Sequence, residues 1–338
     1  MKGRLLLASI VIALFLLPLY VCPSGYAQEK VITLKYSNTF PAANKISAIP
    51  DTWCKEVEKR TNGRVKVTHF PGATLTPPVQ TYDSVVKGIA DVGLSFCSYT
   101  RGKFPLTEAV DLPLGIKSGL HGTKMANEYF KKFKPKEFDE VKVAYLATSP
   151  PHILFTKKPV NNLEEIKGLK IRSTGTSAKV VQALGGAPVG MPMGEAYDAL
   201  SKGVAEGIVC PYEPMKGYNL AETVSYCTPY EQVYANVSFV VINKDKWNAI
   251  SKADQQIVEK INEEWAEKHA KLWDELNVEA KDVFLQKGGK ILMLSKEENA
   301  RWSARLRPIL DEYLKDMKAK GLPGDEALKF CLDYLKAN

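Results

Sequence analysis

Arg172 stands where a protein could bind an anion. The stretch Leu169 to Arg172 has the pattern of a short buried strand, and residues 173–177 lead from it into a helical pattern. A guanidinium offers a planar pair of donors to a carboxylate, and the start of a helix adds partial positive charge. Ligands of open α/β folds bind at the carboxyl ends of strands. Arg172 is therefore a candidate anion-binding residue, and a surface ion pair with Glu164 or Glu165 is the alternative.

A second candidate site is nucleophilic. Cys210 precedes Pro211-Tyr212-Glu213, and with His152 it would form the minimal couple for thiol catalysis. Cys210 ends a predicted strand instead of beginning a helix, and nothing nearby indicates a group that stabilises a thiolate. No phosphate-binding loop, dinucleotide-binding glycine pattern or metal-ligand spacing of histidines occurs. The absence of these motifs argues against an enzyme without excluding one, and we expect no catalytic residue, no cofactor and no metal.

The elements that position these residues alternate between strands and helices. The first half predicts a strand at 31–36, a helix at 46–60, a strand at 65–69, a helix from Pro77 that carries Val79, Tyr82, Val85 and Val86 on one face, and a strand at 92–96. This order predicts a parallel sheet. The second half predicts strands at 141–147, 153–156, 169–172, 207–210 and 239–242, with a helix at 177–184.

A weak internal repeat connects the two halves. Residues 82–91 and 197–206 match at five of ten positions. Each copy has the pattern of a helix end, a glycine after the helix, and a following strand. The repeat indicates two lobes of similar construction.

One predicted helix is longer than either lobe. It begins after Ser251, in a sequence typical of a capping box, and its apolar period extends to about Gln286. At 1.5 Å per residue it would measure roughly 50 Å, so it has to lie across both lobes. Two or three further helices are expected from Lys296 onward.

The N-terminus predicts export. Lys2 and Arg4 precede an apolar stretch, Leu5 to Leu17, and Gly25-Tyr26-Ala27 offers a cleavage site, so residues 1–27 are interpreted as a signal peptide. Cys22 follows Tyr20-Val21 instead of a small residue, which is untypical of a lipid-attachment site. No other segment approaches the roughly 20 apolar residues of a membrane span.

Composition limits the partners of the exported chain. Removal of Lys2 and Arg4 lowers the formal net charge of +8 by two, and the remaining basic residues form no arginine-rich block, so nucleic acid is not an expected partner. The odd number of remaining cysteines and their spacing exclude a disulfide scaffold. These cysteines are Cys54, Cys97, Cys210, Cys227 and Cys331.

Several stretches resemble the solute-binding proteins of tripartite ATP-independent periplasmic (TRAP) transporters. They are residues 82–91, Val110-Asp111-Leu112-Pro113-Leu114, Gly168-Leu169-Lys170-Ile171-Arg172 and residues 191–211. The resemblance runs from Val31 to the C-terminus. It implies that Arg172 forms a salt bridge with a ligand carboxylate. It also implies an α/β bilobal periplasmic-binding-protein fold of type II, with hinge strands and one long helix across both lobes.

The resemblance implies a location, a partner and lobe boundaries. The chain would bind a small organic acid in the periplasm and deliver it to the membrane permease subunits without itself spanning the membrane. Lobe I would comprise 28–149 and about 239–275, and lobe II would comprise 150–238 and about 276–338.

The cleft predicted from the resemblance is less polar than in many relatives. Cys210 stands where they often have Asn, His152 where some have a second Arg, and Met193 where an aromatic residue is common. A monocarboxylate, aromatic or branched, or a 2-oxo or 2-hydroxy acid is therefore expected. A C4-dicarboxylate, a sulfonate, a thiol hydrolase and a ligand-sensing receptor are the alternatives. Further wall residues are predicted from strand ends: Asn38, Phe40, Phe96, Ser98, Tyr212, Tyr234 and Asn236.

Overall fold

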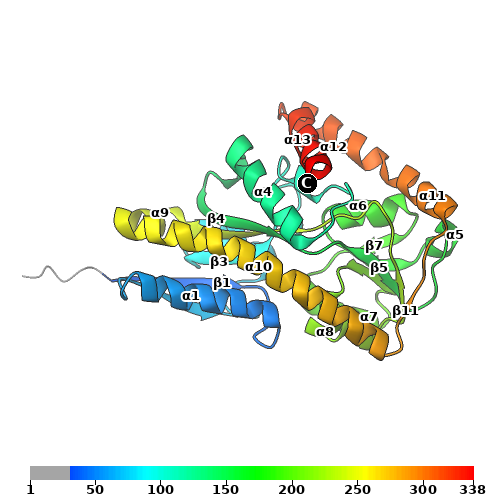
Figure 1. Ribbon diagram of the computed structural model, residues 1–338, viewed down its shortest axis with the longest axis horizontal. Coiled ribbons are helices and arrows are strands. Elements are labelled where there is room, and N and C mark those ends of the chain that lie inside the picture. The colour runs from blue at the N-terminus through cyan, green and yellow to red at the C-terminus, as the bar shows by residue number, and fades with distance from the viewer. Residues whose placement is uncertain (1–30) are drawn as a thin grey trace, which may run out of the picture. The chain divides into compact units, whose positions relative to one another are not determined.

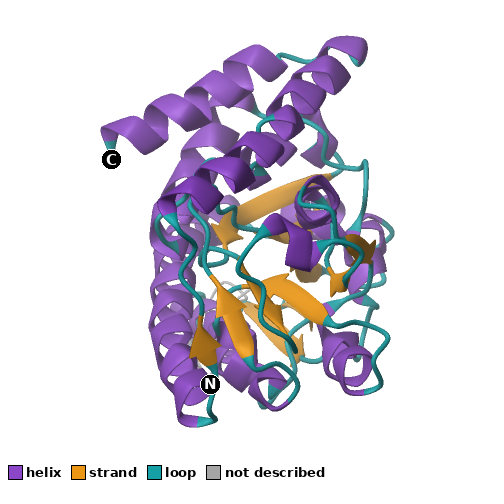
Figure 2. Cartoon of the chain, turned by 90° about the vertical axis from the view of Figure 1, so that its right-hand side faces the viewer, coloured by secondary structure: helices purple, strands orange, loops and turns teal. Residues whose placement is uncertain are grey.

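The computed structural model describes residues 31–338. The predicted signal peptide and Cys22 lie outside this range. Within it, every helix is too short or too polar to cross a lipid bilayer. The part of the chain that is described contains two β-sheets with helices around them (Figure 2).

The first sheet has five strands in the order β2-β1-β3-β10-β4. Its strands are β1 (Ile32–Asn38), β2 (Val65–Phe70), β3 (Val92–Phe96), β4 (Val141–Thr148) and β10 (Val237–Asn243). The helices between these strands are α1 (Ala48–Arg60), α2 (Thr81–Val86), α3 (Glu108–Asp111) and α4 (Gly119–Phe133), and α9 (Lys244–Ala249) follows β10.

The second sheet has six strands in the order β11-β9-β5-β8-β6-β7. Its strands are β5 (Ile153–Thr156), β6 (Lys170–Arg172), β7 (Ala187–Val189), β8 (Gly207–Cys210), β9 (Tyr226–Thr228) and β11 (Lys290–Ile291). Its helices are α5 (Leu163–Ile166), α6 (Thr176–Ala183), α7 (Ala196–Ser201) and α8 (Glu213–Gly217).

The parallel order predicted for the first three strands is confirmed, and the sheet as a whole is mixed. β1 runs parallel to β2 and β3, but β10 runs antiparallel to β3 and β4. The reason is the route of the chain, because β10 enters the first sheet from the second. The prediction that Val79 shares one helix face with Tyr82 and Val85 is wrong, since Val79 is 42% exposed and the other two side chains are buried. The two prolines before it start a 3-10 turn, Pro78–Gln80, so Val79 falls outside the α-helical period.

The internal repeat has a structural counterpart in both halves. Helices α2 and α7 are six residues long, and each is preceded by a three-residue 3-10 turn. Gly88 and Gly203 follow them with left-handed φ values of 71° and 74°. The next strands, β3 and β8, are fully buried. The two copies therefore form the same supersecondary unit, one in each sheet.

Helix α10 (Lys252–Gln286) is the long helix that the sequence predicts. The Ser251 side chain caps it by accepting from Asp254 N–H, and its 35 residues give a length of about 52 Å. It contacts α1, α4 and β4 of the first half and α8 of the second, so it crosses both sheets (Figure 1). Three helices follow: α11 (Lys296–Leu306), α12 (Pro308–Ala319) and α13 (Gly324–Ala337).

Two extended segments also cross between the sheets. They are residues 149–152, between β4 and β5, and residues 229–236, between β9 and β10. They are hydrogen-bonded to each other, because Ser149 N–H donates to the Asn236 carbonyl at 3.0 Å and His152 N–H donates to the Tyr234 carbonyl at 2.9 Å. The buried Asp111 carboxylate accepts from Val237 N–H at 2.7 Å and so fixes the start of β10.

The predicted lobe boundaries remain a prediction. β10 and the first half of α10 lie with the first sheet, as the predicted boundaries require. However, α13 packs against α3 and α4 of the first half, whereas α11 contacts α5 and α6 of the second. A boundary drawn by residue number therefore does not follow the packing at the C-terminus.

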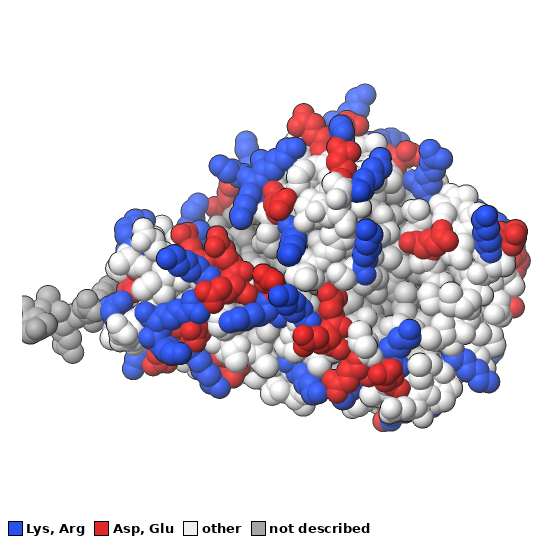
Figure 3. Space-filling view, viewed as in Figure 1, with Lys and Arg blue, Asp and Glu red and all other residues white. Residues whose placement is uncertain are grey.

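Surface charge is mixed in sign. Figure 3 shows Lys and Arg interspersed with Asp and Glu over the face in view. Along α10, for example, Glu259 pairs with Lys142 at 2.7 Å and Glu264 pairs with Arg60 at 2.7 Å. The cysteines within residues 31–338 are all free and buried, as expected for Cys54 and Cys331.

The left-handed backbone conformation of Gly203, one of the two repeat glycines, can be tested by mutation. An added Cβ at Gly203 would meet no atom within 4 Å, so alanine there introduces backbone strain alone. We expect Gly203→Ala to lower the free energy of unfolding in urea by about 1–2 kcal/mol. Gly194→Ala is the matched control, because that glycine is equally uncrowded and has no left-handed φ. Equal losses in the two variants would contradict this account.

Candidate functional site

A small cavity lies between the two sheets. Its volume is about 30 Å³, which is room for about one or two water molecules. Both sheets, both crossing segments and α10 contribute to its wall. The lining residues are Phe40, Phe96, Tyr99, Ser149, His152, Arg172, Met193, Pro211, Glu213, Pro214, Tyr218, Asn236 and Trp273. A solute larger than a few atoms can enter only if the walls move apart.

Arg172 ends β6 and is 1% exposed. Its Nε and one Nη donate to the Met191 carbonyl at 3.0 and 2.7 Å. Among residues 31–338 no carboxylate forms an ion pair with it. The two predicted partners bind elsewhere: Glu164 pairs with Arg301, and Glu165 accepts from Asn161. The surface ion pair considered above is therefore wrong. A buried cation without a protein counter-charge is a site for an anion.

His152 is held neutral behind Arg172. Its Nδ1 lies 2.8 Å from the Tyr234 hydroxyl, and its Nε2 lies 2.8 Å from Ser149 Oγ. Burial, together with the smaller effect of the positive charge of Arg172, lowers the pKa of His152 to about 3. The imidazole therefore adds no second positive charge to the site at neutral pH.

One tautomer of the neutral histidine would direct a hydroxyl proton toward the cavity. Ser149 Oγ accepts from Asn236 N–H at 3.0 Å. If Tyr234 donates to Nδ1, then Nε2–H of His152 donates to Ser149 as well, and both ring nitrogens have a partner. The Ser149 O–H is then left to donate to a ligand beside Arg172. Asn236, which is 6% exposed, also lines the cavity, and its side-chain Oδ1 has no partner within residues 31–338.

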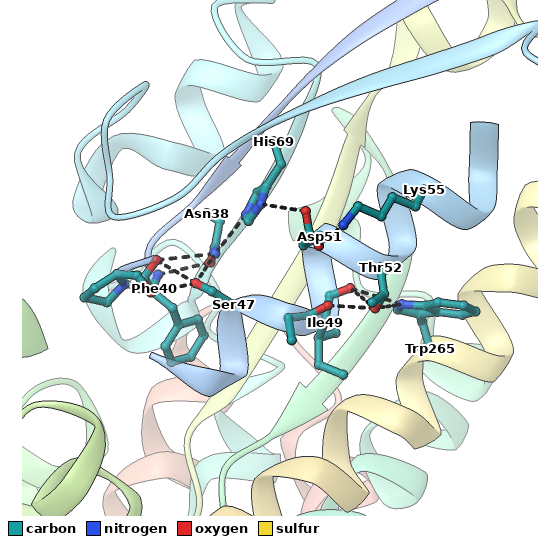
Figure 4. A network of polar contacts seen from close by, with 11 residues as sticks. Asn38, Phe40, Ser47, Ile49, Asp51, Thr52, Lys55, His69 and Trp265 are labelled. Atoms are coloured by element: carbon teal, nitrogen blue, oxygen red, sulfur yellow. Dashed lines mark hydrogen bonds and ion pairs between the residues drawn. The ribbon is translucent and has the colours of Figure 1, made fainter. Parts of the chain in front are cut away.

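Aromatic rings form the wall on the side of the first sheet. The ring of Phe40 meets those of Phe96 and Trp273 edge to face, with centroids 5.9 and 5.6 Å apart. Figure 4 shows how the backbone of Phe40 is held: Asn38 Oδ1 accepts from Phe40 N–H at 3.0 Å, and Ser47 Oγ donates to the Phe40 carbonyl at 2.9 Å. The wall therefore combines apolar rings with a fixed backbone.

Further contacts join the two sides of the cavity. Met193 N–H donates to the Tyr99 hydroxyl at 3.1 Å. Gly175 lies so close to Ser98 that an added Cβ would meet the Ser98 Cβ at 2.7 Å. The two sides are therefore in direct contact around the cavity.

The predicted ligand-contacting residues divide into two groups. Six line the cavity: Phe40, Phe96, His152, Arg172, Met193 and Asn236. Five do not: Asn38, Ser98, Cys210, Tyr212 and Tyr234. Their contacts explain this. Asn38 Nδ2 donates to Ser47 and His69 as Figure 4 shows, Tyr212 contacts Cys227 Sγ at 3.1 Å, and Tyr234 supports His152 from behind. Direct ligand contact by any of these residues remains a prediction.

Several lining residues were not predicted. Trp273 lies in the middle of the long helix, where its apolar period indicates only burial. Glu213 ends the singled-out Cys210-Pro211-Tyr212-Glu213 stretch but was given no role, and its acidic type gives no signal of burial. Only the packing of α10 and α8 brings these two side chains to the cavity.

The Cys/His couple for thiol catalysis is not formed. Cys210 is fully buried, and burial raises the pKa of its thiol well above the usual value. Both ring nitrogens of His152 are bonded to Tyr234 and Ser149 instead. The thiol therefore has no base to activate it.

Two sheets joined by crossing segments, with a buried cation in the cavity between them, define a bilobal periplasmic-binding-protein fold. The family model of bacterial extracellular solute-binding proteins, family 7, matches residues 37–316, and the chain belongs to this family. It is a solute-binding protein of the TRAP type. Proteins of this family are extracytoplasmic receptors that bind small ligands and work with membrane permease components.

Similar proteins cover nearly the whole described chain. A TRAP solute-binding protein of Desulfovibrio salexigens is 31% identical, covers 90% of this chain and 95% of its own, and has a TM-score of 0.79; its structure is an open complex with the C-terminus of a symmetry mate in the ligand-binding site. A marine-metagenome TRAP protein specific for aromatic acid ligands, in complex with metahydroxyphenylacetate, is 28% identical over 90% of this chain and 99% of its own, with a TM-score of 0.85.

A curated relative points to a related class of solute. The monocarboxylate 2-oxoacid-binding periplasmic protein of Nostoc sp. is 28% identical over 73% of this chain and 70% of its own. These two named solute classes, aromatic acids and 2-oxoacids, are properties of the relatives.

The neutrality of His152 can be measured directly. We expect its ring signals in NMR spectra to stay unshifted between pH 8 and pH 5, because its pKa of about 3 lies below this window. Comparison with His152→Gln would assign the signals. A titration with a midpoint near 6.5, the ordinary pKa of histidine, would contradict this arrangement.

Proposed function

We propose that this chain binds a small monocarboxylate, aromatic or branched, or a 2-oxo or 2-hydroxy acid, and delivers it to the permease of its transporter. The observation that carries the proposal is the Arg172 guanidinium, which is buried in the cavity and forms no ion pair with a carboxylate of residues 31–338. The relatives named above, with aromatic acids and 2-oxoacids as their solutes, support this class.

The wall of the cavity supports a monocarboxylate over a more highly charged solute. Arg172 is the one cation among the lining residues, and His152 is neutral. Glu213 adds a carboxyl group, and the rest of the wall offers rings and hydrogen-bonding groups. A single carboxylate therefore matches the single guanidinium, and Phe40, Phe96 and Trp273 offer a surface for an apolar remainder.

Binding would proceed by hinge closure. The solute enters while the sheets stand apart, Arg172 takes the carboxylate, and the segments 149–152 and 229–236 bend as the walls close. The closed protein is the form that docks on the permease. Export by a signal peptide at residues 1–27 would place it in the periplasm.

The solute class can be found by thermal unfolding of the protein with a panel of carboxylates and sulfonates. A ligand at a hundred times its Kd adds about 2.7 kcal/mol to the free energy of unfolding. Stabilisation by monocarboxylates supports the proposal. Stabilisation by sulfonates alone, or by no acid in the panel, contradicts it.

Arg172 should carry the affinity for the acid that the panel identifies. We expect Arg172→Ala to cost at least about 3 kcal/mol, or two orders of magnitude in Kd by calorimetry, because a buried carboxylate loses its partner. Arg172→Lys should cost less, since it keeps the charge and loses the planar pair of donors.

Replacement of Arg172 should not destabilise the ligand-free protein. Burial of an unpaired cation is unfavourable, so Arg172→Ala is expected to leave the stability of the ligand-free protein unchanged or higher. Arg301→Ala, which removes an exposed arginine paired with Glu164, is the matched control and should not alter Kd. Undiminished affinity in Arg172→Ala would overturn the assignment.

A further inference from the structure

Glu213 is a second ionisable group in the wall of the cavity. It begins α8, is 3% exposed, and lines the same cavity as Arg172. No lysine, arginine or histidine within residues 31–338 pairs with it. The two nearby lysines, Lys45 and Lys216, both bind Glu279 on the surface of α10 instead.

One oxygen and the backbone of Glu213 are held by contacts from two other segments. Asn44, which precedes the 3-10 turn Lys45–Ser47 of the first half, donates through Nδ2 to Glu213 Oε1 at 2.9 Å. On the other side, Glu213 N–H donates to Asn277 Oδ1 of α10 at 3.1 Å. An added Cβ at Gly217 would lie 2.5 Å from Asn44 Nδ2 and would also overlap Oε1, so glycine is needed there.

The second oxygen of the carboxyl group has no such partner. Within residues 31–338 no donor is hydrogen-bonded to Glu213 Oε2. Since Oε1 is turned toward Asn44 and the side chain lines the cavity, Oε2 is the atom left to meet a solute. An ionised oxygen in this position accepts a hydrogen bond and repels a second anion.

We infer that Glu213 determines which acids the site accepts: it excludes a second carboxylate and selects a solute that carries a hydroxyl or other hydrogen-bond donor besides the carboxylate bound at Arg172. This inference rests on the proposed function, because it takes the first carboxylate to bind Arg172. The solute would then carry an anion for Arg172 and a donor for Glu213.

Glutamine at this position provides a sharp test, because it reverses the requirement. In Glu213→Gln the side-chain oxygen can still accept from Asn44, and the amide nitrogen then replaces Oε2 toward the cavity. The site would change from an acceptor that repels carboxylate to a donor that binds it. The substitution conserves size and the bond to Asn44, so the fold should be kept.

Two matched sets of acids measure this change. The aromatic set is 3-hydroxyphenylacetate, phenylacetate and 3-carboxyphenylacetate, and the aliphatic set is 4-hydroxybutanoate, butanoate and succinate. Calorimetry at pH 8.5 keeps Glu213 ionised, because burial raises its pKa to about 7. In the wild type we expect the hydroxy acid to bind tightest and the diacid weakest, at least about tenfold apart.

In Glu213→Gln the ratio of diacid to hydroxy-acid affinity should rise by at least about tenfold. Glu279→Gln removes a neighbouring carboxylate on the surface of α10 and is the control for general charge effects; its ratio should match that of the wild type. Monoacid binding that depends on Arg172, with a ratio unchanged in Glu213→Gln, would overturn this inference alone. Absence of binding by all six acids would overturn the proposed function and this inference together.

Discussion

A guanidinium without a protein counter-charge is the constraint on which the rest of this structure depends. Arg172 is enclosed by both sheets and α10, and a backbone carbonyl is its acceptor within the described chain. Removing such a cation from water costs several kcal/mol unless an anion accompanies it. Closure of the walls and binding of an anion are therefore energetically coupled, and this coupling is what a solute receptor needs in order to signal occupancy to a permease.

The surrounding architecture serves this coupling. Two crossing segments and α10 connect the sheets, and the proposed hinge closure would bend the two segments. His152 adds no second positive charge beside Arg172, because its imidazole is neutral. The Nε2 atom of His152 is hydrogen-bonded to Ser149 Oγ. Contacts such as Asn44 with Glu213 and Met193 with Tyr99 join the two sides of the cavity.

The features that the sequence predicts correctly depend on local signals. The cap at Ser251 and the apolar period after it indicate α10, and the repeated helix-glycine-strand pattern indicates the two similar units. Features that depend on packing were missed or misplaced. Glu213 reaches the cavity only because α8 packs on α10, and Asn38 is turned toward its own loop by the N–H of Phe40, a local bond that competes with any ligand. The resemblance to a family indicated that Arg172 binds a ligand carboxylate, whereas spacing alone left a surface ion pair of Arg172 as an equal alternative.

The most direct test of this account is a crystal structure of the protein with the monocarboxylate that stabilises it most. The account predicts that both carboxylate oxygens lie about 2.7–2.9 Å from nitrogens of Arg172, the geometry of a bidentate charge-assisted pair. A solute enclosed in the cavity with its carboxylate directed away from Arg172 would contradict the central claim.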